Sequence, residues 1–134
     1  MRPETYSGPF LVRGDWQNKK NSSLPYKEHV EEEFTCALWK VLPGKESTSF
    51  KLYKDDRMLL SSSHGDGNVV EKQYNDTFIV DWKFNASFDR TDNGATLRCS
   101  VHWEAGTIKE TMNCSHCIDN IEVLCKYLFS NLSQ

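Results

Sequence analysis

The sequence contains no run of about 18 apolar residues, so no segment is expected to cross a bilayer as a helix. Clusters of basic residues are also lacking: Lys19 and Lys20 form the one basic pair, and the formal net charge is -3. This charge argues against a general nucleic-acid binder, which needs a basic patch. The segment from Met1 to Thr5 lacks the apolar core of a signal peptide. We therefore expect that a leader is absent from this chain.

The length of 134 residues suits one domain and is too short for two well-packed ones. Residues 1–24 are polar and interrupted by prolines and glycines, which predicts a lead-in segment or linker with a strand around Pro9 to Val12. Residues 25–128 are then expected to form the domain, and residues 129–134 a C-terminal tail.

The chain contains an excess of N-glycosylation sequons. Nine asparagines should give only about one or two Asn-x-Ser/Thr sites by chance in a chain of this Ser and Thr content. The alternative is that Asn, Ser and Thr merely share turns. Five sites are present, and we predict glycosylation at Asn21, Asn75, Asn85, Asn113 and Asn131.

The cysteines form an odd set: Cys36, Cys99, Cys114, Cys117 and Cys125. In an oxidising compartment four would pair, and the fifth would stay free or link two chains into a dimer. The alternative is a reduced cytosolic protein whose cysteines are small buried hydrophobes. Together with the sequons, the set favours an extracellular protein, either secreted or the ectodomain of a membrane protein.

Short segments that alternate apolar and polar side chains recur between turn signals. Six or seven such segments predict an all-β sandwich or barrel. The residues expected to face inward are Phe34, Cys36 and Leu38; Phe50 and Leu52; Phe78, Val80, Trp82 and Phe84; and Leu97, Cys99 and Val101.

The last third of the sequence is less regular. Glu104 to Asp119 is expected to be a long polar connection. Residues 118–129 fit two periods, and the choice between them stays open. Ile121, Val123 and Cys125 alternate as in a strand, whereas Ile118, Ile121, Leu124 and Leu128 have helical spacing.

Two of the inward-facing residues, Cys36 and Cys99, are cysteines on different predicted strands. Such a pair can bridge two packed sheets. Closing so long a loop would stabilise the fold by roughly 4 kcal/mol. The alternative is two unrelated buried thiols.

Three segments resemble the immunoglobulin superfamily. Phe50 to Leu59 resembles an immunoglobulin C strand and its turn, and Arg90 to Val101 resembles the E–F corner and F strand of constant-like domains. That second segment is similar to the second domains of nectin-like adhesion molecules. Asn120 to Tyr127 resembles the closing G strand. The resemblance implies a two-sheet immunoglobulin-like sandwich over about residues 25–128, with Cys36–Cys99 as the inter-sheet disulfide.

The sequence departs from the immunoglobulin pattern at two positions. Leu52 occupies the place of the C-strand tryptophan, so Trp39, Trp82 or Trp103 is expected to fill that volume. Leu97 replaces the tyrosine of the tyrosine corner, a tyrosine that nectin-like second domains also lack.

Cys114-Ser115-His116-Cys117 is the segment most suggestive of chemistry. It would suit a redox site or two zinc ligands, but no second ligand pair and no βαβ pattern accompany it. We expect instead an extra disulfide from Cys125 to Cys114 or Cys117. The histidines are scattered and no nucleophile motif is present, so we expect no enzyme, no metal and no cofactor.

The sequence favours an extracellular recognition or adhesion module, or an immune recognition protein, that binds a protein or glycan. The connection from Glu104 to Asp119 is the favoured binding loop because rigid scaffolds often bind through loops. One alternative is a lipocalin-like carrier of a small hydrophobic ligand, suggested by Gly14-Asp15-Trp16. Another is a structural spacer without a partner of its own.

Overall fold

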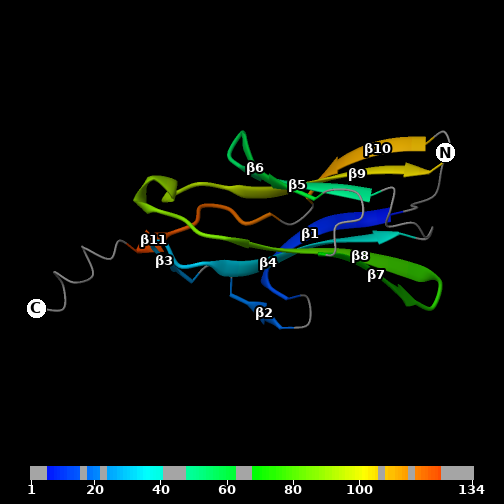
Figure 1. Cartoon of the computed structure of the whole chain (residues 1–134), viewed down its shortest axis with the longest axis horizontal. Coiled ribbons are helices and arrows are strands. Elements are labelled where there is room, and N and C mark those ends of the chain that lie inside the picture. The colour runs from blue at the N-terminus through cyan, green and yellow to red at the C-terminus, as the bar shows by residue number, and fades with distance from the viewer. Residues whose placement is uncertain are drawn as a thin grey trace, which may run out of the picture.

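Two β-sheets lie face to face in the computed structural model, which describes residues 6–15, 18–21, 24–40, 48–62, 68–105, 108–114 and 117–124. The five-stranded sheet has the order β2 (Lys19–Lys20), β1 (Tyr6–Gly14), β4 (Glu32–Lys40), β8 (Thr77–Ala86) and β7 (Val69–Tyr74). The four-stranded sheet has the order β10 (Ile108–Asn113), β9 (Leu97–Ala105), β5 (Thr48–Lys54) and β6 (Arg57–Ser61). Both sheets are antiparallel throughout, and Figure 1 shows them as two layers.

Two smaller elements complete the described chain. β3 (Tyr26–Lys27) pairs in parallel with β11 (Val123–Leu124). A short 3-10 helix, η2 (Arg90–Asp92), joins β8 to β9. Within the described ranges η2 is the one helical element, so the predicted all-β class is confirmed.

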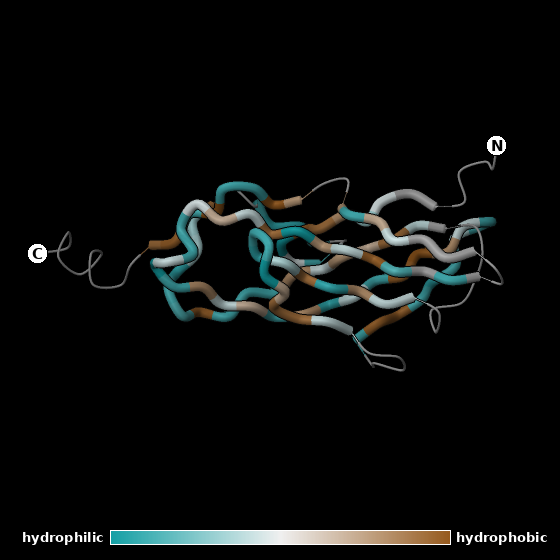
Figure 2. Tube along the Cα trace, turned by 90° about the horizontal axis from the view of Figure 1, so that it is seen from above, coloured by the Kyte–Doolittle hydropathy of each residue, from teal (hydrophilic) through white to brown (hydrophobic). Residues whose placement is uncertain are grey.

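The core lies between the two sheets. Cys36 of β4 and Cys99 of β9 are fully buried and form a disulfide with a Cα–Cα distance of 6.5 Å. The predicted inter-sheet bridge is therefore confirmed. The alternation of brown and teal along the strands in Figure 2 reflects the same inward and outward period. Two separate sheets joined in this way are not a closed barrel, so the lipocalin-like alternative is wrong.

Trp82 fills the volume that Leu52 leaves. The indole lies on β8 directly opposite Cys36 and is 2% exposed. It stacks on Phe50 across the core with ring centroids 5.8 Å apart, and it contacts Phe84 at 4.4 Å. Offset aromatic pairs of this kind add to the free energy gained by burial. Trp82 is thus the residue that replaces the missing C-strand tryptophan.

Residues 6–14 belong to the sandwich, although the sequence predicted a lead-in segment over residues 1–24. β1 pairs with β4 along its length, and Leu11 is buried in the core. The pairing shifts register between Ser7 and Phe10. This irregularity falls at Gly8 and Pro9, and it conceals the period-two signal. The domain therefore begins well before residue 25.

Buried Arg13, at the end of β1, holds the following loop against the domain. Its guanidinium lies 3.8 Å from the ring centroid of Tyr26 and 3.1 Å from a carboxylate oxygen of Glu32. It also donates hydrogen bonds to the carbonyl oxygens of Asn21 and Leu24. Burial raises the pKa of Tyr26 to about 12, so its phenol stays neutral beside this cation.

The segment expected to be a long connection, Glu104 to Asp119, instead contains strand β10. β10 pairs with β9 from Ile108 opposite Ala105 to Asn113 opposite Ser100. An edge strand needs only one neighbour and tolerates polar side chains, which is why its sequence shows no clear alternation. The prediction of a long polar loop is wrong.

The chain after β10 is extended rather than helical as far as it is described. Ile118 forms a bridge with Leu97, and β11 pairs with β3. Ile121 and Val123 are buried, whereas Glu122 is exposed. Burial therefore alternates as in a strand and does not follow the helical period. Within the predicted closing strand from Asn120 to Tyr127, the described strand is β11, which pairs with β3 and not with the four-stranded sheet, so this prediction is wrong. Residues 125–129 lie outside the described part of the chain.

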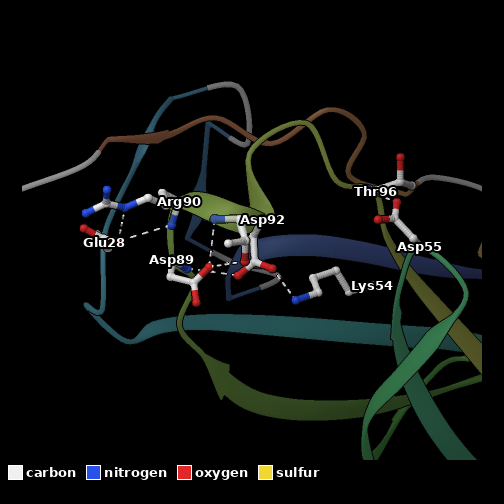
Figure 3. Close-up of polar contacts among 8 residues, drawn as sticks. Glu28, Lys54, Asp55, Asp89, Arg90, Asp92 and Thr96 are labelled. Atoms are coloured by element: carbon white, nitrogen blue, oxygen red, sulfur yellow. Dashed lines mark hydrogen bonds and ion pairs between the residues drawn. The ribbon is translucent and has the colours of Figure 1, made fainter. Parts of the chain in front are cut away.

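A polar network fixes the end of the domain where β8 turns into β9 (Figure 3). The Asp89 carboxylate accepts a hydrogen bond from the Thr91 amide, and Asp92 accepts one from the Asp89 amide, which together form a capping box. Hydrogen bonds from the hydroxyl and amide of Thr91 hold the pKa of Asp89 below its usual value.

The same network connects the two sheets. Asp92 is buried and forms an ion pair with Lys54 at the end of β5. Asp55, in the turn after β5, accepts a hydrogen bond of 3.1 Å from the Thr96 amide. These contacts fix the path of the chain into β9 and so fix the position of this strand in the four-stranded sheet.

Candidate functional site

The outer face of the four-stranded sheet carries a group of exposed or half-exposed side chains on straight, paired strands. β9 is central in this sheet, because β10 pairs with one of its edges and β5 with the other. Side chains next to inward-facing Leu52, Cys99 and Val101 must point outward. The resulting surface, called here the β5–β9–β10 face, consists of Lys51, Tyr53, Arg98, His102, Glu104, Thr111 and Asn113.

Arg98 lies in the middle of the polar contacts on this face. Its guanidinium is 5.0 Å from the ring centroid of Tyr53, the residue directly opposite on β5. It donates to the side-chain oxygen of Asn113 at 3.3 Å and to the backbone oxygen of Asp55 at 3.2 Å. With 31% of its side chain exposed, Arg98 is held in one orientation and remains accessible. Such a pre-organised side chain loses little conformational entropy on binding.

His102 is the centre of a second hydrogen-bond chain. Its Nδ1 lies 2.9 Å from the Thr111 hydroxyl, and its Nε2 lies 2.8 Å from a Glu104 carboxylate oxygen. A hydroxyl, an imidazole and a carboxylate in this order are the parts of an activated nucleophile. The imidazole, however, is 40% exposed on a flat strand face, where bulk water competes for each of these bonds. The backbone N–H groups of β9 beside His102 take part in strand pairing. Among the described residues, the Thr111–His102–Glu104 hydrogen-bond chain therefore has no free N–H donors beside it that could form an oxyanion hole.

A bulge in the pairing with β9 separates Asn113, at the end of β10, from Ile118. Asn113 lies opposite Ser100 and Ile118 lies opposite Leu97, so this strand has two more residues than its partner. A disulfide between Cys114 and Cys117 closes the bulge, with a Cα–Cα distance of 5.6 Å. The Cys114 sulfur also accepts a hydrogen bond from the Cys99 amide at 3.4 Å.

This pairing corrects the expectation that Cys125 bonds to Cys114 or Cys117. Two cysteines three residues apart meet here because the bulge brings their Cα atoms together, which a regular strand would not do. Cys125 lies outside the described residues. Cys114 and Cys117 are half-buried. They belong to the predicted binding loop, Glu104 to Asp119, and follow Asn113 in the chain.

The predicted glycosylation sites lie at the surface where they are described. Asn21, Asn75, Asn85 and Asn113 are all exposed. Asn75 occupies the turn between β7 and β8, and Asn85 lies on the outer face of β8. Asn131 lies outside the described residues. Glycosylation stays a prediction.

No three His, Cys, Asp or Glu side chains gather as metal ligands within the described ranges, and His116 lies outside them. In the same ranges there is no helix of the length and apolarity that crossing a membrane requires.

Comparisons with known proteins show which architecture this fold resembles. No family model matches the sequence, and no curated protein matches it. The ectodomain of mouse nectin-like molecule 4, with domains Ig1 to Ig3, superposes on 87% of this chain with a TM-score of 0.52 and 15% identity. The fold is immunoglobulin-like. The chain spans 33% of that ectodomain, so the likeness concerns one part of a longer protein.

A second solved structure, Rst D1-D2, covers 75% of this chain and has a TM-score of 0.48 and 12% identity. The chain spans 44% of that structure. In immunoglobulin terms, β4 and β9 are the strands that carry the inter-sheet disulfide, and β10 is the closing strand. β4 and β9 were predicted from the sequence, whereas β10 was not.

Proposed function

We propose that this protein is an extracellular recognition module that binds a protein or glycan partner through the β5–β9–β10 face and catalyses no reaction. The observation that carries the proposal is the Arg98 side chain, held over the Tyr53 ring on a rigid strand pair. Arginine and tyrosine are enriched among the residues that dominate binding energy at interfaces. A fixed and half-exposed pair of this kind provides such an anchor.

Three further features support an extracellular location and an adhesive role. Both disulfides of the described chain are typical of proteins that mature in oxidising compartments. The four described sequon asparagines are exposed, as glycosylated asparagines must be. The fold is similar to that of an ectodomain of a nectin-like molecule, and Arg90 to Val101 resembles the constant-like subset. Cys125, the fifth cysteine, would allow a covalent dimer.

The exposure of the β5–β9–β10 face supports a binding role over catalysis. The Thr111, His102 and Glu104 chain lies open to water on a flat sheet, where it can neither exclude solvent nor hold an oxyanion. Hydrogen bonds among these residues instead fix their positions for contact with a partner.

The test uses the secreted chain displayed in many copies on beads. Beads coated with the chain measure self-adhesion, and arrays of cell-surface ectodomains and of glycans measure binding to other partners. Arg98→Ala should weaken a detected interaction by about 30-fold, the effect of removing a typical anchor of about 2 kcal/mol. Arg90→Ala is the matched control, because Arg90 is exposed and lies at the η2 end of the domain.

Equal binding by the wild-type chain and the Arg98→Ala variant would contradict the assignment of this face. Absence of any bound ectodomain, glycan or second copy would contradict the recognition function and favour a structural spacer. Ser115→Ala separates the effect of a glycan beside Arg98 from that of the side chains, since it removes the sequon of Asn113 and keeps the hydrogen bond between Arg98 and Asn113.

A further inference from the structure

The opposite face of the domain contains a small cavity that no feature of the proposed function uses. It lies on the outer side of the five-stranded sheet, over β7 and β8, and has a volume of about 150 Å³. Asn68, Val70, Lys72, Asp81 and Lys83 line it. In Figure 1, β7 and β8 lie side by side at the end of the domain away from β11. This group of residues is called here the Asp81 cavity.

Asp81 is an unusual residue for this position. It is 8% exposed, and its neighbours across the sheet are the apolar residues Ala37 on β4 and Val70 on β7. No described group forms a hydrogen bond with its Oδ1 oxygen. A buried acceptor without a partner costs free energy, and rotation of the Asp81 carboxylate toward a donor in the adjoining cavity would recover that cost.

Two lysines give the Asp81 cavity donors as well as an acceptor. Lys83 lies 3.4 Å from the carboxylate of Asp15, and Lys72 is exposed at the rim. Burial raises the pKa of Asp81, and the charges of Lys72 and Lys83 act in the opposite direction. The formal charges of the two lysines, of Asp81 and of Asp15, which pairs with Lys83, add to zero. The cavity therefore favours a neutral ligand over an anion or a cation.

The chemistry of the lining narrows the ligand further. The Asp81 carboxylate can accept hydrogen bonds, the lysine ammonium groups can donate them, and a hydroxyl group does both. Val70 is 42% exposed and offers an apolar surface to carbon-bound hydrogens. The volume of about 150 Å³ lies below the roughly 300 Å³ of ordinary small-molecule pockets, so one ring is accommodated rather than an extended ligand.

We propose that the Asp81 cavity binds one neutral sugar ring, with adjacent hydroxyl groups that donate to Asp81 and accept from Lys72 or Lys83. This site goes beyond the proposed function, since it lies on the other sheet and does not need the β5–β9–β10 face. Sugar binding at the cavity and partner binding at the β5–β9–β10 face can therefore be found, or fail, independently.

Two sources of such a ring are present in an extracellular setting. One is a glycan of another molecule. The other is a glycan on Asn85, which lies on the same side of β8 as Asp81, four residues further along the strand. At the rise of an extended strand this separation is about 13 Å, within reach of the first few sugars of a glycan.

The first experiment uses the unglycosylated, disulfide-bonded chain labelled with nitrogen-15. Methyl glycosides of glucose, galactose, mannose and N-acetylglucosamine are titrated separately, and amide shifts are followed by NMR. For at least one glycoside, we expect saturable shifts at Val70, Asp81 and Lys83. Absence of such shifts for every glycoside at concentrations up to tens of millimolar would overturn the proposal.

Two variants of Asp81 and one control identify the group responsible. Asp81→Asn should weaken binding by about tenfold, because it removes the charge from the acceptor. Asp81→Leu should abolish binding and leave the fold intact, because leucine packs between Ala37 and Val70 without an unpaired oxygen. Asp56→Asn removes the same charge from an exposed turn of the other sheet and should change nothing. Binding that persists in Asp81→Leu would overturn the assignment.

The second experiment distinguishes the two sources. Spectra of the glycosylated chain are compared with those of its Asn85→Gln variant. Altered shifts at Val70, Asp81 and Lys83 that disappear in Asn85→Gln indicate that the chain's own glycan occupies the cavity. Unaltered shifts, with free glycoside bound equally by both forms, indicate a glycan from another molecule. Failure of both forms to bind any sugar at the cavity would refute the proposal.

Discussion

The two sheets have similar inner faces and different outer faces. Inside, each contributes one cysteine of the same bridge and a set of buried apolar side chains. Outside, Arg98 and His102 of the four-stranded sheet both have hydrogen-bond partners, whereas Asp81 of the five-stranded sheet has a buried oxygen without one among the described groups. The polar side chains of the first face hold one another in place, whereas the second face keeps an unmet hydrogen bond in a hollow. The difference explains why we place the proposed small-ligand site at a buried polar group and not where polar groups are most numerous.

Breaking the covalent link between the sheets should have the largest effect. The double variant Cys36→Ala, Cys99→Ala is expected to lower the free energy of unfolding by about 4 kcal/mol, because the bridge closes a long loop of the unfolded chain. Urea unfolding monitored by tryptophan fluorescence measures the change. A loss of less than about 1 kcal/mol would show that the two inner faces hold together without the bridge.

Removing the second disulfide should have a smaller effect that is confined to one sheet. Cys114→Ala, Cys117→Ala is expected to cost at most about 2 kcal/mol, because the closed loop is so short. Hydrogen exchange should quicken at β10 and stay unchanged in the five-stranded sheet. A mild thiol reductant should also open this half-buried bridge before the fully buried one, as alkylation and mass spectrometry would show.

Exchange that quickens equally in both sheets would contradict this second prediction. So would reduction of Cys36–Cys99 first. Either result would mean that the bulge at the end of β10 supports the whole sandwich rather than one edge.

The smallest effect is expected from Asp81→Asn, and it should depend on pH. Burial raises the pKa of Asp81 above its ordinary value of 3.8, so folding favours the protonated form. Stability contributed by Asp81 is therefore present below that ordinary value and is lost as the pH rises through the pKa of the folded state. Asp81→Asn removes this loss and should gain about 1 kcal/mol near pH 7.

The measurement is the free energy of unfolding of both proteins from pH 3 to pH 7. The two curves should converge near pH 3 and separate as the pH rises. Asp56→Asn, an exposed change of the same kind, should give parallel curves. A gain for Asp81→Asn that is equal at all pH values would contradict the role given to the buried charge.

The parts of the fold that follow a simple period were predictable from the sequence. Leu97, Cys99 and Val101 alternate without interruption, and the structure places them inside. β1 was predicted only in part, as a strand around Pro9 to Val12 outside the domain, because the irregularity at Gly8 and Pro9 breaks its period. β10 was missed because an edge strand with one neighbour has no need for alternating side chains.

The candidate sites were less predictable than the strands. Asp81 lies between the inward-facing residues Val80 and Trp82 in the sequence and so faces outward, but its burial depends on Ala37 and Val70 from two other strands. Likewise, the contact of Arg98 with Tyr53 depends on the register between β9 and β5. Local sequence carries no signal for either, because both arise from strand pairing between distant segments.

The bridge between Cys36 and Cys99 also determines how the domain responds to mechanical tension. A pulling force applied outside the bridged loop passes through the sulfur atoms and bypasses the residues between them. With a sequence separation of 63, the bond withholds roughly 200 Å of extended chain from such a force. Stretching can lengthen the outlying segments, but most of the sandwich stays at a fixed contour length.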